Sequence, residues 1–370
     1  NPRYDIRLFT GPQKKAVAES AGFHVVPILE NHIEDFERAA NNDQQLGILS
    51  AYQQLSSSID LINVVSDQLL EEWQMSRPDI VIADFITLSG GLVANQLGIP
   101  WITTMATQFV LETTDGPPCL FGGMGSPKNS WQATIQFLGR KATRIVKRIV
   151  FFSFRDRLKR YKFKLYNHLG HETIYSPYSI LAIGMKELEL KKGFPEHFRW
   201  VGPSGTSVEA GEDYPLDLTP FIERKKVLVT CGTQLAWAKE NLICQAKQLA
   251  KAHPECHFFV TRGVGGEAFQ CENLMENLSV VSYLPYKEYI PQMDYVIHHG
   301  GAGIFYQCII YGKPALILPH DYDQFDYAVR GVEAGVAFTV KRDNSKDIGH
   351  AFEELLAKEN WPELETLRQA

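Results

Sequence analysis

The chain has 370 residues, more than one ordinary domain needs, and this length predicts two or three domains. Hydrophobic residues make up 45% of it and charged residues 22%, which is typical of a globular protein and excludes disorder, a fibrous repeat and a membrane bundle. The net charge of −6 argues against a nucleic-acid partner for the chain as a whole.

Strand and helix patterns alternate through the first half. Short apolar runs predict strands, and longer runs with helical spacing predict the helices between them. The expected strands are Asp5–Phe9, Phe23–Val26, Asp79–Ala83 and Ile99–Thr104, and the expected helices are Leu46–Met75 and Leu88–Leu97. This order is typical of a parallel sheet covered by helices.

A stretch rich in glycine, proline and serine between Val201 and Pro220 predicts the domain linker, which we place at residues 206–220. The alternation then restarts. The expected strands are Lys226–Cys231, His257–Thr261, Ser279–Tyr283, Tyr295–His298, Ala315–Leu318 and Ala337–Val340, and a last helix covers Lys346–Leu356. The sequence therefore predicts two α/β domains of Rossmann type, residues 1–205 and 221–370.

The six cysteines form no C-x-x-C pair and fit no zinc site or disulfide framework. Scattered cysteines of this kind are typical of a reducing compartment, so we expect a cytoplasmic protein.

A glycine-rich turn, residues 299–303, follows the strand that ends at His298. Glycines let the backbone approach a ligand, and the helix expected from Ile304 presents free N–H groups and the positive end of its dipole. This arrangement predicts a pyrophosphate site to which His299 donates, and a purely structural turn is the alternative. The spacing matches neither the dinucleotide G-x-G-x-x-G motif nor a P-loop.

Two other strand ends of the same domain carry polar residues. Gly232 and Thr233 follow the first strand, and Asp323 and Gln324 follow the strand Ala315–Leu318. Because strand ends on one edge of a doubly wound sheet share a crevice, we expect all of them to face one ligand.

Together these residues resemble the nucleotide-sugar signature of family 1 glycosyltransferases. The turn from His299 to Gly303 is followed after 25 residues by Gln324, within the pattern Pro319-x-x-x-Asp323-Gln324. Pro285, 14 residues before His299, fits the bacterial branch that is similar to the macrolide glycosyltransferases. The first half shows the resemblance only in places, notably in the stretches 78–84 and 97–100.

The resemblance implies a GT-B fold, in which two Rossmann-like domains face a cleft. It implies inverting transfer from a UDP- or TDP-sugar to a hydroxyl of a small or lipidic acceptor, as a hexosyltransferase does, with no cofactor and no metal. Residues 1–205 would bind the acceptor and residues 221–370 the nucleotide sugar, with a final helix that returns to the first domain. The donor-binding residues it implies are Gly232, Thr233, Tyr283, Leu284, His299, Gly300, Gly301, Ala302, Gly303, Gln307, Asp323 and Gln324.

Individual roles also follow from the resemblance. Tyr283 would stack on the base and the backbone of Leu284 would read its edge, while His299 and the turn amides hold the pyrophosphate. Gln307 stands where relatives carry a glutamate that grips the ribose, so the charge-assisted bond is lost. Ile304 and Tyr286 are two further departures, and all three leave the nucleotide preference open.

Asp84 matches the aspartate that orients the catalytic base in the resembling family, and the alternative is a helix N-cap. The histidine base itself is expected upstream of Asn1, since the first βα unit of the family has no counterpart here. His24 lies within a strand pattern and is no substitute.

A basic segment, Arg140–Lys164, holds eleven Lys or Arg and one Asp, interleaved with apolar residues at helical spacing. It predicts one or two amphipathic helices. One interpretation is a solvated helix whose apolar side packs on the core, and the other is docking on an anionic membrane surface, which favours a lipidic acceptor and a peripheral location. No nucleic-acid module accompanies the charge.

Three alternatives to a transferase of this kind remain. A non-catalytic GT-B homologue could act as a partner or activator subunit, and a sugar-nucleotide epimerase would need acid and base carboxylates at the cleft. Asp321 and Asp323 also form a D-x-D pattern typical of metal-binding GT-A transferases, although it lies too late in the chain for that role.

Overall fold

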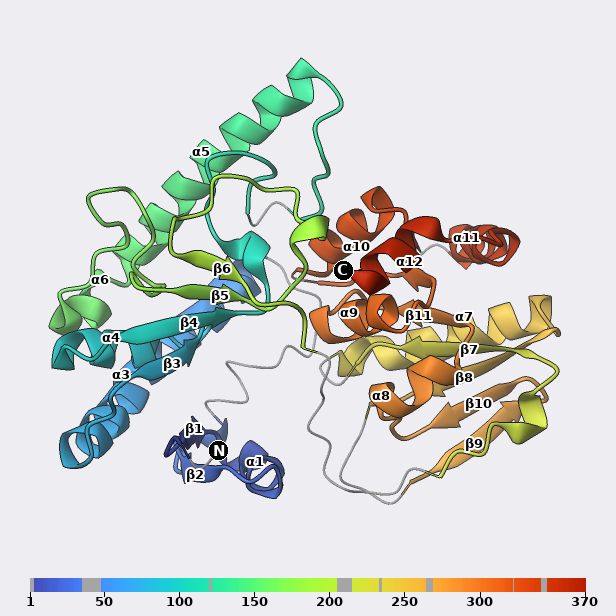
Figure 1. The fold of residues 1–370 in the computed structure, drawn as a ribbon, viewed down its shortest axis with the longest axis horizontal. Coiled ribbons are helices and arrows are strands. Elements are labelled where there is room, and N and C mark those ends of the chain that lie inside the picture. Colours follow the sequence, from blue (N-terminus) through green and yellow to red (C-terminus); the bar gives the residue numbers. More distant parts are fainter. Residues whose placement is uncertain are drawn as a thin grey trace.

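The structure is a computed structural model that describes residues 3–34, 48–119, 122–204, 215–232, 235–263, 269–321, 323–340 and 345–370. Two α/β halves lie side by side, the N-terminal half on the left of Figure 1 and the C-terminal half on the right.

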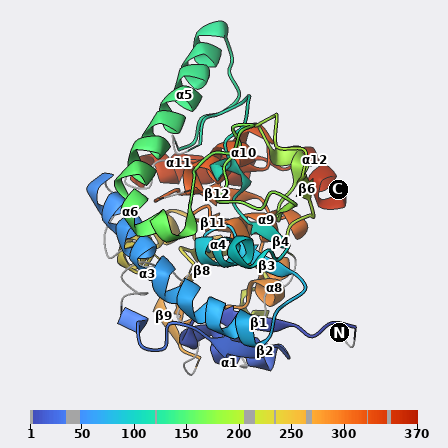
Figure 2. The ribbon, with the colours of Figure 1, turned by 90° about the vertical axis from the view of Figure 1, so that its left-hand side faces the viewer.

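The N-terminal half holds two parallel sheets, one of two strands (β1-β2) and one of four (β3-β4-β5-β6). The small sheet lies apart from the large one and below it in Figures 1 and 2. The strands of the N-terminal half are β1 (Arg7–Thr10), β2 (His24–Pro27), β3 (Val81–Asp84), β4 (Trp101–Met105), β5 (Ile180–Ala182) and β6 (Phe198–Trp200). Its α-helices are α1 (Lys15–Ser20), α3 (Ile48–Met75), α4 (Leu88–Leu97), α5 (Ser130–Ser153) and α6 (Arg155–Leu158).

The C-terminal half is built on one seven-stranded sheet with the order β13-β12-β11-β7-β8-β10-β9, in which only β9 is antiparallel to its neighbour. The strands are β7 (Lys225–Thr230), β8 (Cys256–Thr261), β9 (Cys271–Met275), β10 (Leu278–Val281), β11 (Tyr295–His298), β12 (Ala315–Ile317) and β13 (Ala337–Thr339). The α-helices are α7 (Lys239–Ala252), α8 (Tyr286–Tyr289), α9 (Ala302–Ile310), α10 (Gln324–Glu333), α11 (Ser345–Ala357) and α12 (Pro362–Gln369).

The strand order of this sheet fixes where a ligand can bind. Read from β10 through β8, β7, β11 and β12 to β13, it is the order of a doubly wound nucleotide-binding sheet, and the winding reverses between β7 and β11. Helices cover both faces, so strand residues such as Leu228, Phe258 and Leu316 are fully buried. The apolar runs in the sequence arise from this burial.

Most predicted elements are found within a few residues of their expected bounds, and the segments 88–97 and 295–298 match. The sequence patterns miss β5 and β6, which have three residues each, and β9, whose first residues are exposed. They also miss α12. This last helix packs through Leu364 and Leu367 into a core cluster that also contains Phe109, Met185 and Leu188 of the N-terminal half, so the expected return of the final helix to the first domain stays a prediction.

Most of the predicted linker, residues 206–214, lies outside the described residues, and the domain bounds 1–205 and 221–370 stay predictions. In the part of the chain that the structure describes, none of the helices combines the length and the apolar character that a membrane crossing requires.

Candidate nucleotide-sugar site

The carboxyl ends of β7 and β11 meet at the point where the sheet reverses its winding. These strands are parallel neighbours, and Thr230 pairs with His298 at their ends. Gly232 lies two residues beyond β7 and His299 directly follows β11, so both predicted residues lie at the crevice where doubly wound sheets bind ligands. Thr233, the third residue predicted here, lies outside the described residues.

The imidazole of His299 lies between two glycines. A Cβ atom added at Gly232 would come within 3.0 Å of its Cε1 atom, and one added at Gly301 within 2.4 Å of its Nε2 atom. Gly232 also has a φ of +67°, a conformation that favours glycine. The two glycines therefore provide the space for this ring.

Burial lowers the pKa of His299 to about 4; the nearby His320 adds to this shift and a hydrogen bond to the backbone of Thr230 opposes it. The ring is therefore neutral near pH 7. Its Nδ1 atom is buried and has no partner among the described residues. A ligand that reached this atom would meet a ring nitrogen ready to form a hydrogen bond.

The glycine turn leads directly into α9. Gly300 has a φ of +92°, and a Cβ there would lie 3.0 Å from the carbonyl oxygen of Gln324 and from Ile317, so only glycine fits. Gly301 is the N-cap of α9, and no side chain caps the helix. The first N–H groups of α9 therefore point into the turn beside His299, where they can bind an anionic group.

Gln324 and Asp323 lie beyond β12, as predicted, but each already has a partner. The Oε1 atom of Gln324 accepts hydrogen bonds from the N–H groups of His320 (2.8 Å) and Asp321 (3.1 Å), which leaves its amide NH₂ as the donor for a ligand. The carboxylate of Asp323 accepts a 2.7 Å hydrogen bond from the hydroxyl of Thr107 in the other half. Burial raises the pKa of Asp323, and this bond opposes the shift.

The other predicted donor residues lie after β10 and in α9. Tyr283 and Leu284 follow β10; the Leu284 side chain is buried in the core, so only its backbone can face a ligand, and Tyr283 is half-buried. Gln307 is buried in the second turn of α9. Its Nε2 atom lies 3.5 Å from the carbonyl of Ser204, and its Oε1 atom has no partner in the described part of the chain.

Asp84 is the last residue of β3 and pairs in register with Thr104 of β4. Its Oδ1 atom accepts a 3.1 Å hydrogen bond from the N–H of Ile86, whereas α4 begins at Leu88 with Thr87 as its N-cap. The alternative that Asp84 caps the helix is therefore wrong. Burial raises the pKa of Asp84, and the N–H groups of Ile86 and Phe85 oppose the shift.

The loop after β4 connects the two halves at this site. Besides Thr107, its Ala106 carbonyl accepts a 2.9 Å hydrogen bond from the Tyr327 hydroxyl, and the Gln108 amide donates to the Tyr306 hydroxyl at 3.1 Å. Asp84 pairs with Thr104, which is the last residue but one of β4. Asp84 therefore lies on the edge of the N-terminal sheet from which the loop after β4 reaches Asp323. No sequence motif marks Thr107 or Gln108.

A buried ion pair joins the halves further along α10. Arg330 contacts Glu189 at 2.6 Å and Asp326 at 3.3 Å, and its guanidinium lies 4.3 Å from the centre of the Phe109 ring. The side chains of Arg330 and Glu189 are only 1% and 2% exposed. The two residues are 141 positions apart in the chain, so no local pattern indicates that they pair.

The described residues contain no group of three or more His, Cys, Asp or Glu side chains positioned to hold a metal ion. In the D-x-D pattern, Asp323 is bonded to Thr107, and Tyr322 lies outside the described residues.

Comparisons with known proteins show what the chain is similar to. Residues 265–365 match the family model of the erythromycin biosynthesis protein CIII-like C-terminal domain. The 4'-demethylrebeccamycin synthase of Lentzea aerocolonigenes is 23% identical to the chain over 384 residues, which cover 95% of this chain and 85% of that protein.

Solved structures show the same fold. The glycotransferase of kitacinnamycin superposes with a TM-score of 0.70 at 18% identity, covering 98% of this chain and 86% of that one. The spinosyn rhamnosyltransferase SpnG complexed with thymidine diphosphate superposes with a TM-score of 0.62 at 15% identity, covering 98% and 87%.

Proposed function

Since this chain has the GT-B fold and is a homologue of the antibiotic glycosyltransferases, as its motif predicted, we propose that it transfers a sugar with inversion from a UDP- or TDP-sugar to an acceptor hydroxyl. The observation that carries the proposal is the placement of His299 and the uncapped start of α9 together at the reversal point of the sheet.

In this reaction the acceptor oxygen loses its proton to a base and attacks the anomeric carbon of the sugar. The bond between that carbon and the phosphate oxygen breaks, and the nucleoside diphosphate leaves with the bonding electrons. The α9 N–H groups and His299 stabilise the charge that develops on the diphosphate. Asp323 and the Gln324 amide hold the sugar hydroxyls, and the Gln307 oxygen accepts from the ribose.

We assign Asp84 the role of orienting the histidine base that the resemblance implies. Its carboxylate stands at the carboxyl end of β3, beside the strand whose following loop reaches Asp323.

We further propose that the acceptor is hydrophobic or lipidic and that the protein meets it as a peripheral protein at a membrane surface. The support is the basic segment Arg140–Lys164 in the half expected to bind the acceptor.

The test measures binding and hydrolysis of UDP- and TDP-sugars by the wild type and by His299→Ala. We expect the variant to lose donor binding, while His350→Ala on the exposed side of α11 keeps it. Failure of every nucleotide sugar to bind, or unchanged binding by His299→Ala, would show the donor site to be wrongly assigned.

A second pair of variants tests Asp84. We expect Asp84→Asn to bind the donor normally but to lose turnover, and Asp79→Asn, an exposed aspartate ahead of the same strand, to match the wild type. Donor binding by the wild type without any turnover would instead favour the non-catalytic partner subunit.

A further inference from the structure

Helix α5 turns its apolar side to solvent. Trp131, Leu138, Ile145, Ile149 and Phe152 follow the helical repeat along one side, and they are 71%, 58%, 57%, 65% and 65% exposed. The interpretation that the apolar side packs on the core is therefore wrong for this side of α5, although later apolar residues of the basic segment, such as Phe154 and Leu158, are buried in a core cluster. A helix of 24 residues is about 36 Å long. The exposed apolar side chains therefore form a continuous strip along α5, unlike the single exposed apolar residues that are common on protein surfaces.

The opposite side of α5 faces the protein, and it is polar along residues 130–147 before apolar side chains near the end of the helix pack against a core cluster. Gln136 and Thr143 are buried, and they donate hydrogen bonds to the backbone carbonyls of Gly125 (2.6 Å) and Cys119 (3.0 Å). The helix is thus inverted relative to the usual surface helix, whose apolar side is covered by the core.

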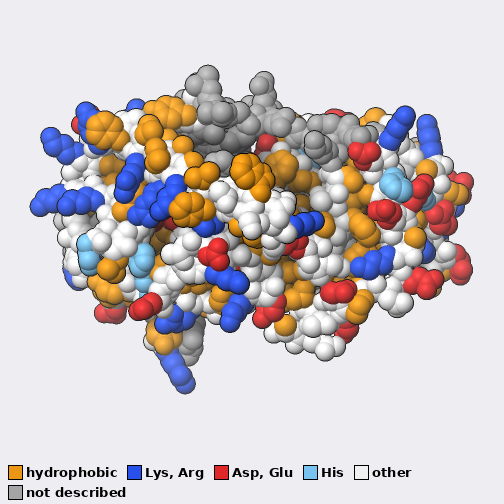
Figure 3. Space-filling view, turned by 90° about the horizontal axis from the view of Figure 1, so that it is seen from above, with side chains coloured by type: hydrophobic (Ala, Val, Ile, Leu, Met, Phe, Trp, Pro, Cys, Tyr) orange, Lys and Arg blue, Asp and Glu red, His pale blue; other side chains and the backbone are white. Residues whose placement is uncertain are grey.

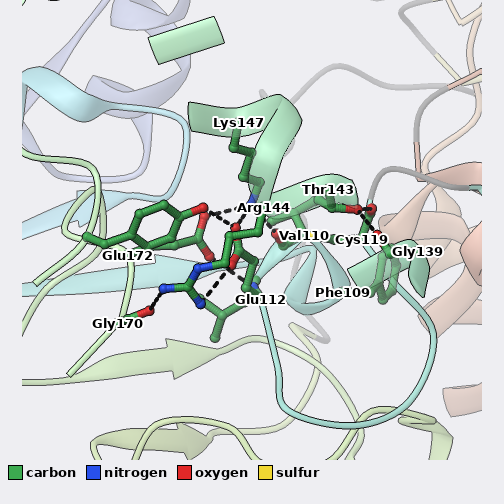
Figure 4. A network of polar contacts seen from close by, with 12 residues as sticks. Phe109, Val110, Glu112, Cys119, Gly139, Thr143, Arg144, Lys147, Gly170 and Glu172 are labelled. Carbon is green, nitrogen blue, oxygen red and sulfur yellow. Dashed lines mark hydrogen bonds and ion pairs between the residues drawn. The ribbon is translucent and has the colours of Figure 1, made fainter. Parts of the chain in front are cut away.

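An ion-pair network holds the helix in this orientation (Figure 4). Lys147 bonds Glu172 at 2.6 Å, with side chains 11% and 1% exposed, while Arg144 donates to the carbonyl of Gly170 and lies 3.6 Å from Glu112. Burial alone would lower the pKa of Lys147, but Glu172 outweighs it and the pKa is raised, so Lys147 stays charged. Rotating α5 to bury its apolar side would expose or separate these charges.

Basic side chains accompany the apolar strip. Lys141 and Arg148 are exposed along one border of it, and Arg155 beyond its end lies over the ring of Phe152 at 4.2 Å. From above, the half of the molecule that holds α5 shows blue side chains among orange ones, whereas the red side chains gather over the other half (Figure 3). Figures 1 and 2 show the upper part of α5 projecting from the body of the molecule.

The positive charge on and beside α5 indicates which kind of partner binds this surface. A second copy would bring two segments of the same strong positive charge together, which opposes association. An anionic lipid surface instead complements the basic side chains while its acyl region accepts the apolar ones. A tryptophan at one end and long basic side chains beside the strip suit the interface between headgroups and acyl chains.

We propose that the outward side of α5 (Trp131, Leu138, Ile145, Ile149, Phe152) inserts into the headgroup region of an anionic membrane, with Lys141 and Arg148 contacting lipid phosphates. This inference deepens the proposed function and rests on its membrane part alone. In this arrangement α5 is the helix that contacts the membrane. The half that holds Asp84, and not the nucleotide site, then faces the lipid from which the acceptor would come.

The test is flotation with vesicles of phosphatidylglycerol and phosphatidylcholine, and with vesicles of phosphatidylcholine alone. We expect the wild type to float with the anionic vesicles, and the double variant Ile145→Gln/Ile149→Gln to lose about tenfold or more in partitioning. Ile222→Gln changes an isoleucine of the other half that is even more exposed; it is the matched control and should float like the wild type. Lys141→Glu/Arg148→Glu should also reduce flotation, and high salt should weaken it.

Several outcomes would overturn the proposal: no flotation of the wild type, flotation of Ile145→Gln/Ile149→Gln at the wild-type level, or equal flotation with neutral vesicles. A dimer of the wild type that this variant dissolves would assign the strip to a second copy. Because all substituted side chains are exposed, near-ultraviolet circular dichroism should confirm that the variants fold. Donor hydrolysis without vesicles tests the transferase separately, so either idea can fail alone.

Discussion

Replacing Glu189 by glutamine tests whether the buried ion pair holds the two halves together. The substitution keeps the shape of the side chain but removes the charge opposite Arg330, which is 1% exposed and 2.6 Å away. Breaking a buried pair costs about 3–5 kcal/mol, because the remaining charge stays desolvated. Asp326 still lies 3.3 Å from Arg330, so we expect the lower end, about 3 kcal/mol.

Hydrogen exchange gives a local measure of this loss. The N–H of Gly123 is bonded to the carboxylate of Asp326, so this bond breaks when the halves separate. A loss of about 3 kcal/mol in the closed state corresponds to exchange up to about 100-fold faster. Small-angle scattering should show a larger radius of gyration for the same variant.

The matched control is Glu276→Gln, which breaks a pair with Arg224 whose glutamate is 87% exposed and should change neither readout. Arg330→Met should destabilise the closed state less when it is added to Glu189→Gln than when it is introduced alone. Exchange at Gly123 that stays at the wild-type rate in a folded Glu189→Gln protein would refute the reasoning.

Three further predictions concern the nucleotide site. Burial holds the pKa of His298 at about 3 and that of His299 at about 4, below the value in the unfolded chain. The free energy of unfolding should therefore fall as the pH drops from about 6.5 towards 4, by up to about 1.4 kcal/mol per pH unit for each ring. Urea titrations with a constant midpoint over this range would contradict this prediction. Binding of UDP near His299 should raise the pKa of this ring, so the complex should take up a proton. Calorimetry in two buffers should then report proton uptake, and UDP should bind more tightly at about pH 5 than at about pH 7. Equal affinities at the two pH values would count against a contact between His299 and a phosphate. Gly301→Ala places a Cβ 2.4 Å from the His299 ring and should weaken UDP binding about tenfold or more, whereas Gly349→Ala, whose Cβ meets no atom within 4 Å, should leave it unchanged; loss of binding in both variants would point to a general fault in folding.

The sequence was most informative where one short segment carried both structure and chemistry. The turn after His298 combines an apolar strand, glycines and a helix start, and each of these is visible within a few residues. Strands β5 and β6 were missed because three residues are too few to show a period.

Contacts between distant segments could not be predicted. Thr107 and Asp323 are 216 residues apart, and neither carries a sign of the other. Helix α5 shows a different limit: its amphipathic pattern predicted the helix correctly but not which side faces the protein. That choice depends on Glu112 and Glu172, which come from other parts of the chain and pair with the basic side.

The hydrogen bond between Thr107 and Asp323 has a consequence for donor binding. One oxygen of the carboxylate that we assign to the sugar hydroxyls, Oδ2 of Asp323, already accepts a hydrogen bond from the other half of the same molecule. Thr107 is therefore an intramolecular competitor of the donor sugar, and the measured affinity is the intrinsic one multiplied by the fraction of molecules in which this bond is open. By this reasoning Thr107→Val, which removes the hydroxyl, should bind the nucleotide sugar more tightly than the wild type while binding the free nucleotide equally well.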